Sequence, residues 1–167
     1  GDANAPVSCS DDVVSFRSPA GATQRWQRLP TRDTETTFSS AGTKLVGQLI
    51  EPAGPADPKR PLVVLVHGSE RTMAVAAIYQ RMLVAQGISV FAYQKRGTGD
   101  SEGEYTQNFE LLADDAAAAL AKARELARGR FGRAGYFGGS QGGWIAPLAA
   151  TRSQADFVAI GFGLVVS

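Results

Sequence analysis

The sequence predicts an α/β protein with a doubly wound, mostly parallel sheet and an antiparallel hairpin at its N-terminal end. Two observations lead to this fold class. Continuous runs of branched and apolar residues recur along the chain, as is typical of strands covered on both faces of a parallel sheet. Segments with apolar residues at helical spacing separate these runs, and alternating strands and helices form a parallel sheet with helices on both faces. The length of 167 residues suits one such domain.

The N-terminal part of the chain differs from this pattern. Residues 1–24 are rich in small and polar residues, so we expect an irregular arm with one short strand at Val13–Phe16. Residues 25–167 are expected to belong to the α/β domain. Within them, Glu35–Ser39 and Leu45–Glu51 have strand character and are separated by a turn-forming Ala-Gly pair, which predicts an antiparallel hairpin at the leading edge of the sheet.

The remaining elements are expected to alternate between strand and helix. The first helix is expected to end at Gly87, because glycine readily adopts the left-handed conformation that ends many helices. Asn108 is expected to cap the long second helix, in which Asp114 and Asp115 are expected to face solvent. The expected buried strands are Leu62–Val66, Ile88–Tyr93, Ala134–Phe137 and Phe157–Val166, and the expected helices lie around residues 77–85, 109–126 and 141–150.

The overall composition excludes several classes of partner. Seventeen basic and sixteen acidic residues leave a formal charge of +1, which gives no reason to expect nucleic acid or an anionic membrane. No apolar run approaches the roughly 18 residues of a membrane span. Cys9 is the only cysteine, so we expect no internal disulfide and no thiolate cluster for zinc. No metal and no cofactor are expected. The start at Gly1 lacks signal-peptide features but fits a mature protein, so the location stays open, with periplasmic or secreted favoured over cytoplasmic.

The strongest functional signal is the sequence Gly-Gly-Ser-Gln-Gly at residues 138–142. It lies between a predicted buried strand and a predicted helix, the context in which G-x-S-x-G forms a nucleophile elbow. A serine at such a strained turn needs neighbours without Cβ atoms, and Gly138 and Gly142 provide that clearance. Ser140 is therefore the predicted nucleophile. The helix that follows directs its free N–H groups and positive dipole end towards a developing oxyanion.

A second motif, His67-Gly68-Ser69, directly follows the first buried strand. In a parallel sheet this loop and the Ser140 turn lie at the same carboxyl edge, where ligands bind in such folds. Gly68 allows the backbone to approach closely, and the N–H groups of Ser69 and Gln141 are predicted to form an oxyanion hole. His67 is predicted to support this loop through hydrogen bonds.

These two motifs, together with the segment at residues 93–101, resemble the α/β-hydrolase superfamily. Within it, they are similar to the bacterial esterase and serine-aminopeptidase-like branch, also described as dienelactone-hydrolase-like. The resemblance implies hydrolysis of a small-molecule acyl substrate through a serine ester at Ser140. It also implies that Arg96 and Ser101 brace the loop beside the site, whereas Gln94 departs from the Asp common in such relatives. The matching segments are residues 65–69, 93–101 and 137–147.

The resemblance further implies an acid and a histidine after later strands, in the chain order Ser, acid, His. His67 precedes Ser140 and is therefore not expected to be the general base. Asp156 is the only acidic residue after Ser140, and it comes too early to be the acid. We therefore expect the N-terminal part of a hydrolase, completed by a second chain or by a missing C-terminal segment.

Two function classes stay open at this point. The first is a serine hydrolase that acts on a carboxylic ester, with thioester, lactone and peptide substrates as further possibilities. The second is a non-catalytic α/β domain that binds a ligand or is a degenerate remnant. The intact glycines of the elbow and the His-Gly-Ser loop favour the enzyme, because a remnant need not keep them.

Overall fold

The computed structural model describes residues 7–163, except for the side chains at positions 74 and 75. The chain forms two compact units, Gly1–Pro30 and Thr31–Ser167. The division falls after Pro30, whereas the sequence pattern alone placed it after residue 24. In the described part of the chain, no helix has the length and apolar character needed to cross a bilayer.

The first unit is an antiparallel sheet with the strand order β1-β2-β3. The strand expected at Val13–Phe16 corresponds to β2, but the segment expected to be irregular also contains β1 and the start of β3. Every residue of β1 and β3 is exposed, so no apolar alternation marks these strands in the sequence. The strands are β1 (Ser8–Cys9), β2 (Val13–Arg17) and β3 (Thr23–Gln27).

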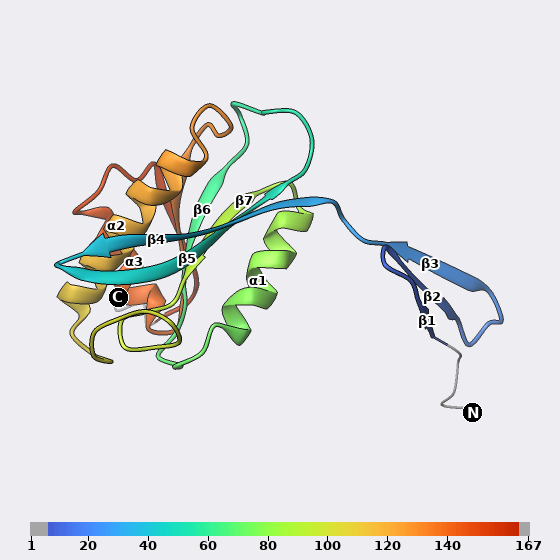
Figure 1. Ribbon diagram of the computed structural model, residues 1–167, viewed down its shortest axis with the longest axis horizontal. Coiled ribbons are helices and arrows are strands. Elements are labelled where there is room, and N and C mark those ends of the chain that lie inside the picture. Colours follow the sequence, from blue (N-terminus) through green and yellow to red (C-terminus); the bar gives the residue numbers. More distant parts are fainter. Residues whose placement is uncertain (1–6, 164–167) are drawn as a thin grey trace. The chain divides into compact units, whose positions relative to one another are not determined.

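The second unit contains a sheet with the strand order β4-β5-β7-β6-β8-β9 (Figure 1). The four strands β7, β6, β8 and β9 are parallel, which confirms the predicted parallel core. β4 and β5 form the predicted antiparallel hairpin, and β5 joins it to β7. Residues 164–166 of the expected last strand lie outside the described residues. The strands are β4 (Thr31–Ser40), β5 (Thr43–Pro52), β6 (Leu62–Val66), β7 (Ser89–Tyr93), β8 (Ala134–Gly139) and β9 (Phe157–Phe162).

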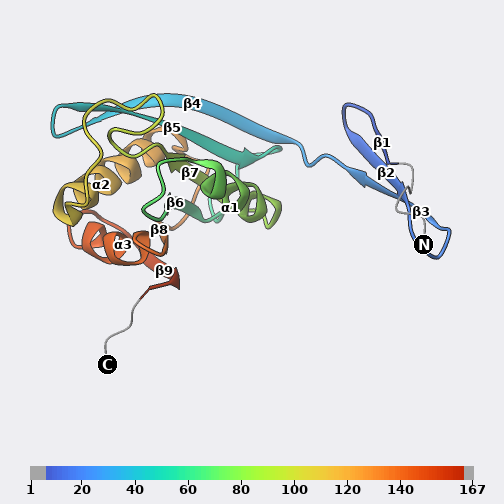
Figure 2. The same ribbon diagram turned by 90° about the horizontal axis from the view of Figure 1, so that it is seen from below.

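Helices cover both faces of this sheet, as predicted (Figures 1 and 2). The two faces have separate apolar clusters because successive side chains of a strand point in opposite directions. In β6, Val64 and Val66 belong to the cluster of α2 and α3, whereas Leu65 belongs to the cluster of α1. The helices are α1 (Ala74–Ala85), α2 (Phe109–Leu126) and α3 (Gly142–Ala150).

The predicted helix ends are present in the structure. Gly87 has φ +83°, a left-handed value that suits the residue just after α1. At the start of α2, the Asn108 side chain accepts a hydrogen bond of 3.2 Å from the N–H of Leu111. This bond satisfies one of the N–H groups that lack an intrahelical partner at the start of a helix.

Replacing the cap should measurably weaken α2. We expect Asn108→Ala to lower the free energy of unfolding by about 1 kcal/mol, the usual cost of losing a polar cap. Urea denaturation followed by circular dichroism would measure the change. Asn108→Asp should keep the bond and most of the stability, so an equal loss in both variants would contradict the capping role.

Candidate active site

Ser140 occupies the turn between β8 and α3. Its φ is +50°, a left-handed value that is uncommon for residues other than glycine and indicates a constrained backbone. The turn is held by hydrogen bonds of 2.8 Å from the Ser140 N–H to the Phe162 carbonyl and from the Gly143 N–H to the Ser140 carbonyl. The Ser140 side chain is exposed. The constrained, accessible serine that the sequence predicts at this turn is therefore present.

The glycines around Ser140 are required by close backbone contacts. A Cβ atom at Gly142 would lie 1.8 Å from the carbonyl oxygen of Val66, and one at Gly138 would lie 2.2 Å from the carbonyl oxygen of Gly142. Both collisions are with backbone atoms, which cannot move aside as a flexible side chain can. These glycines thus allow the start of α3 to pack against the ends of β6 and β8.

The loop that follows β6 lies beside the Ser140 turn. β6 and β8 are parallel neighbours, and their register pairs Val66 with Gly138, so both chains leave the sheet at the same edge. A Cβ atom at Gly68 would lie 3.3 Å from the Cβ of Ser140. The structure therefore brings Gly68 against the predicted nucleophile. The oxyanion role of the Ser69 and Gln141 N–H groups stays a prediction.

Lys95 is the main residue of this region that sequence reasoning missed. Its side chain is buried, and its Nζ donates hydrogen bonds of 2.9 Å to the His67 carbonyl, 2.7 Å to the Gly68 carbonyl and 2.7 Å to the Gln141 Oε1. Burial lowers the pKa of Lys95 to about 8, although Glu70 opposes this shift. Its place next to Arg96 in a recognised segment was the available signal, but lysine is usually exposed, and the sequence does not reveal its partners.

Further polar side chains, which are more exposed than Lys95, contact the loop that follows β6. The Tyr105 hydroxyl donates a 2.8 Å hydrogen bond to the Ser69 carbonyl. Gln107 hydrogen-bonds to the Tyr105 hydroxyl and accepts a hydrogen bond from the Gln141 side chain. Side chains from one long loop therefore hold three consecutive carbonyl groups, those of residues 67–69.

The imidazole of His67 does not have the predicted hydrogen bonds. The residue is 5% exposed, and neither ring nitrogen has a hydrogen-bond partner within the described part of the chain. A Glu70 carboxylate oxygen lies 3.5 Å from Nδ1, at the outer limit for a hydrogen bond. Burial, with the positive charge of Lys95, lowers the pKa of His67 to about 4. The loop is instead held through its carbonyl groups, because the buried amine of Lys95 reaches them.

The Ser140 hydroxyl is not hydrogen-bonded to a general base in the described part of the chain. Across residues 7–163, its hydroxyl makes no hydrogen bond. A general base must lie within hydrogen-bond distance of the proton that it removes, or one water molecule away. The described site therefore combines a predicted nucleophile with a candidate oxyanion loop, and no direct contact to a base is present among the described residues.

A cavity of about 270 Å³ opens beside Ser140. Gly68, His67 and Glu70 border it on the side of the loop. Its other walls are mostly apolar, and a volume at the lower end of ligand pockets suits a small apolar group. The remaining lining residues are Leu65, Val66, Ala76, Tyr79, Phe137, Gly139 and Phe162.

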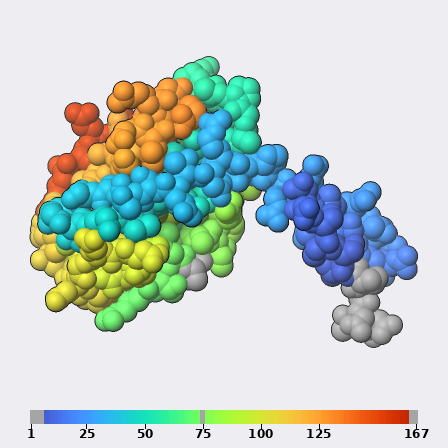
Figure 3. Space-filling model, viewed as in Figure 1, coloured from blue at the N-terminus to red at the C-terminus, as the bar shows by residue number. Residues whose placement is uncertain are grey.

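The loop after β7 is braced as the resemblance implied. The buried Arg96 side chain forms two hydrogen bonds with Asp115 of α2, from Nε at 2.8 Å and from a terminal nitrogen at 2.5 Å. Ser101 accepts a 2.9 Å bond from the Val46 N–H and donates a 2.8 Å bond to the Gln94 carbonyl. The loop thus lies against the β4–β5 hairpin, as the yellow and cyan surfaces of Figure 3 show.

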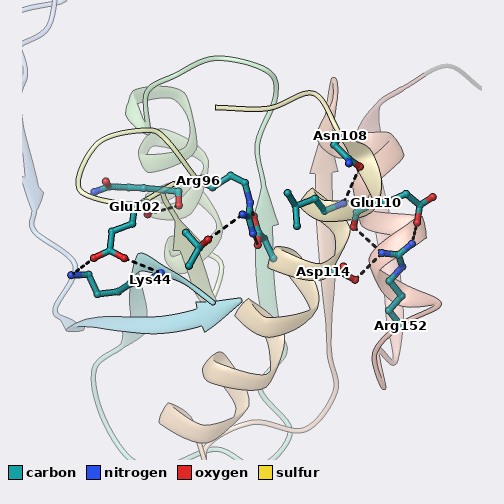
Figure 4. A network of polar contacts seen from close by, with 12 residues as sticks. Lys44, Arg96, Glu102, Asn108, Glu110, Asp114 and Arg152 are labelled. Atoms are coloured by element: carbon teal, nitrogen blue, oxygen red, sulfur yellow. Dashed lines mark hydrogen bonds and ion pairs between the residues drawn. The ribbon is translucent and has the colours of Figure 1, made fainter. Parts of the chain in front are cut away.

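The expectation that Asp115 faces solvent was wrong. Its side chain is fully buried, whereas the neighbouring Asp114 is half exposed and pairs with Arg152 at 2.7 Å. Figure 4 shows Asp114 and Glu110 both directed towards Arg152. Adjacent residues on a helix point about 100° apart, so only Asp115 faces the sheet. It is tolerated there because Arg96 supplies the opposite charge.

Comparison with known sequences identifies the family. The profile of the family described as "Serine aminopeptidase, S33" matches residues 57–165. The chain belongs to this family. No curated protein sequence matches the chain significantly.

Solved structures place the S33-family chain among α/β hydrolases by fold. It is similar to a hypothetical protein from Pseudomonas aeruginosa, with a TM-score of 0.68, 20% identity, and coverage of 78% of this chain and 42% of the other. For a lidless α/β serine hydrolase from Xanthomonas campestris, the TM-score is 0.65 and the identity 20%, and the match covers 78% of this chain and 61% of the other. For an esterase from Pyrococcus furiosus, the TM-score is 0.58 and the identity 21%, and the match covers 71% of this chain and 44% of the other. The chain thus spans 42–61% of the length of these three proteins.

Asp156 does not approach the site of this S33-family chain. Its carboxylate accepts a 2.7 Å hydrogen bond from the Ala134 N–H and lies 3.2 Å from Arg124. Ala134 begins β8, whereas Ser140 follows its end, so Asp156 lies at the opposite edge of the sheet. Its role is to hold the start of β8 against the chain that leads into β9.

Proposed function

We propose that this S33-family chain carries the nucleophile of a serine hydrolase, with Ser140 forming a covalent acyl-enzyme. The observation that carries the proposal is the backbone of Ser140, held at φ +50° with an exposed side chain at the start of α3. Such strain persists only where the surrounding structure enforces it, and it recurs at active sites. The glycine contacts around the turn provide that enforcement.

The proposed reaction is acyl transfer to water. The Ser140 oxygen attacks the carbonyl carbon of an ester, and the carbonyl oxygen becomes an oxyanion. The N–H groups of Gln141 and Ser69 stabilise this charge, assisted by the positive end of the α3 dipole. The alcohol leaves with a proton, and water then hydrolyses the ester bond at Ser140 to release the acid and restore the enzyme.

We further propose that the general base and its acid partner come from outside residues 1–167. His67, the only histidine, has a buried ring with a pKa of about 4 and is thus a weak base. The chain's coverage of only 42–61% of three similar structures is consistent with a second chain or a further segment completing the site. The favoured substrate is a small acyl ester, in keeping with the apolar cavity of about 270 Å³.

Labelling with a fluorophosphonate tests the nucleophile. We expect the complete gene product to be labelled once per chain at Ser140, as peptide mass spectrometry would locate. Ser140→Ala should abolish both labelling and hydrolysis of a short-chain activated ester. Ser69→Ala is the matched control, because it removes a nearby hydroxyl but keeps the N–H that the mechanism uses. Absence of label at Ser140 in the wild type would favour the non-catalytic binding domain instead.

A further inference from the structure

We propose that Lys95 is a positioning residue that holds the two sides of the oxyanion hole in their catalytic arrangement. The proposal deepens the proposed function and rests on it. Its basis is that one buried amine contacts both proposed donor segments, through the carbonyls of His67 and Gly68 on one side and the Gln141 side chain on the other.

Lys95 fixes the direction of the Ser69 N–H through the preceding peptide group. The Gly68 carbonyl and the Ser69 N–H belong to the same planar unit, and the peptide is trans, so the two groups point in opposite directions. Because the Lys95 amine holds the Gly68 oxygen at 2.7 Å, the Ser69 N–H must point away from that amine. A rotation of this peptide would remove the donor from the oxyanion.

The same amine also contacts Gln141, whose backbone N–H is the second proposed donor of the oxyanion hole. The Gln141 side chain is largely buried, and its Oε1 accepts a hydrogen bond of 2.7 Å from the Lys95 Nζ. The backbone N–H of Gln141 directly follows Ser140 in the chain. A lysine ammonium has three protons, and here each has one acceptor. Bonds from a charged donor are stronger than neutral ones, so the arrangement is held firmly.

The protonation of Lys95 provides a readout that a purely structural role would not affect. With a pKa near 8, the amine becomes neutral as the pH rises, and a neutral amine has only two protons for three acceptors. The charged groups that act on it in the described residues are Glu70 and Asp115, and His67 is neutral in this range. We expect the acylation rate to fall as the pH rises through about 8.

The effect of the same titration on stability has the opposite sign. The pKa of Lys95 is lowered from 10.5 in the folded protein, so between about pH 8 and 10.5 the unfolded chain binds more protons at this site. Its contribution to stability therefore increases with pH in this window. A comparison of wild type with Lys95→Met isolates this contribution from those of other groups.

The test measures labelling rates, kcat and KM for the complete gene product. Lys95→Met should label at Ser140 about 10²-fold more slowly and lose a similar factor in kcat, with KM within a few-fold, because a small displacement of the donors affects mainly the transition state. The control is Lys44→Met, which removes a lysine on the hairpin whose partner is Glu102, at 2.9 Å (Figure 4). It should leave all three quantities unchanged.

The outcomes separate the two proposals. If the wild type is labelled and Lys95→Met reacts at the same rate, the role of Lys95 is refuted and the serine mechanism stands. If the wild type is not labelled at Ser140, the proposed function itself fails. If Lys95→Met does not fold, the pH dependence of wild-type labelling still tests the role of Lys95. A labelling rate that stays constant from pH 8 to 10 would overturn that role. An alkaline decrease that persists in a folded Lys95→Met would overturn it too.

Discussion

Residues 1–167 alone are expected to react with a fluorophosphonate at least about 10²-fold more slowly than the complete gene product, because a positioned general base contributes about 10²–10⁴-fold. The only imidazole of the chain is that of His67, and burial keeps it neutral and weakly basic. Members of a catalytic triad act as a unit, so the loss can exceed the contribution of the base alone. Without a base, Ser140 has only the reactivity of an ordinary alcohol.

The measurement is the second-order rate of labelling, with circular dichroism to establish that the isolated chain is folded. His67→Ala in the isolated chain is the matched control, and we expect it to leave the slow rate unchanged. Rapid stoichiometric labelling of Ser140 in residues 1–167 would contradict the proposal that a base is supplied from outside. If His67→Ala abolished such rapid labelling, His67 would be the base.

Asp115→Ala is expected to be the most destabilising of the substitutions considered. It would leave the Arg96 guanidinium buried without its partner, which typically costs about 3–5 kcal/mol. Asp114→Ala is a closely matched control, because it removes an adjacent carboxylate whose pair with Arg152 is half exposed. Such pairs contribute about 0–1 kcal/mol.

Urea denaturation of the two variants would measure the difference. A further variant separates the loss of the ion pair from the cost of leaving one charge buried without a partner. Replacing both partners by apolar residues, as in Arg96→Met with Asp115→Leu, should restore much of the stability, because no buried charge remains. Equal destabilisation by Asp115→Ala and Asp114→Ala would show that the buried pair contributes no more to the free energy of unfolding than the half-exposed pair.

The strained turn at Ser140 was predictable because its requirements are local. A serine between glycines at the junction of a buried strand and a helix has few conformations, and the close contacts of Gly138 and Gly142 explain the glycines. The parallel strands were predictable for a similar reason, since burial on both faces requires continuous apolar runs. The N-terminal strands β1 and β3 were not, because strands with every residue exposed have no such pattern.

The polar interior of the site was decided only by tertiary structure. Lys95 and Asp115 are buried although their residue types are usually exposed, and nothing near them in the sequence identifies their partners. The partners of Lys95 lie 27, 28 and 46 positions away, and Asp115 pairs with a residue 19 positions earlier. The sequence by itself therefore determined the strained Ser140 turn and the parallel sheet, through local sterics and periodicity. The long-range packing decided which charges are buried and which carbonyl groups they hold, because a buried charge is stable only where the fold brings it an opposite charge or enough hydrogen bonds.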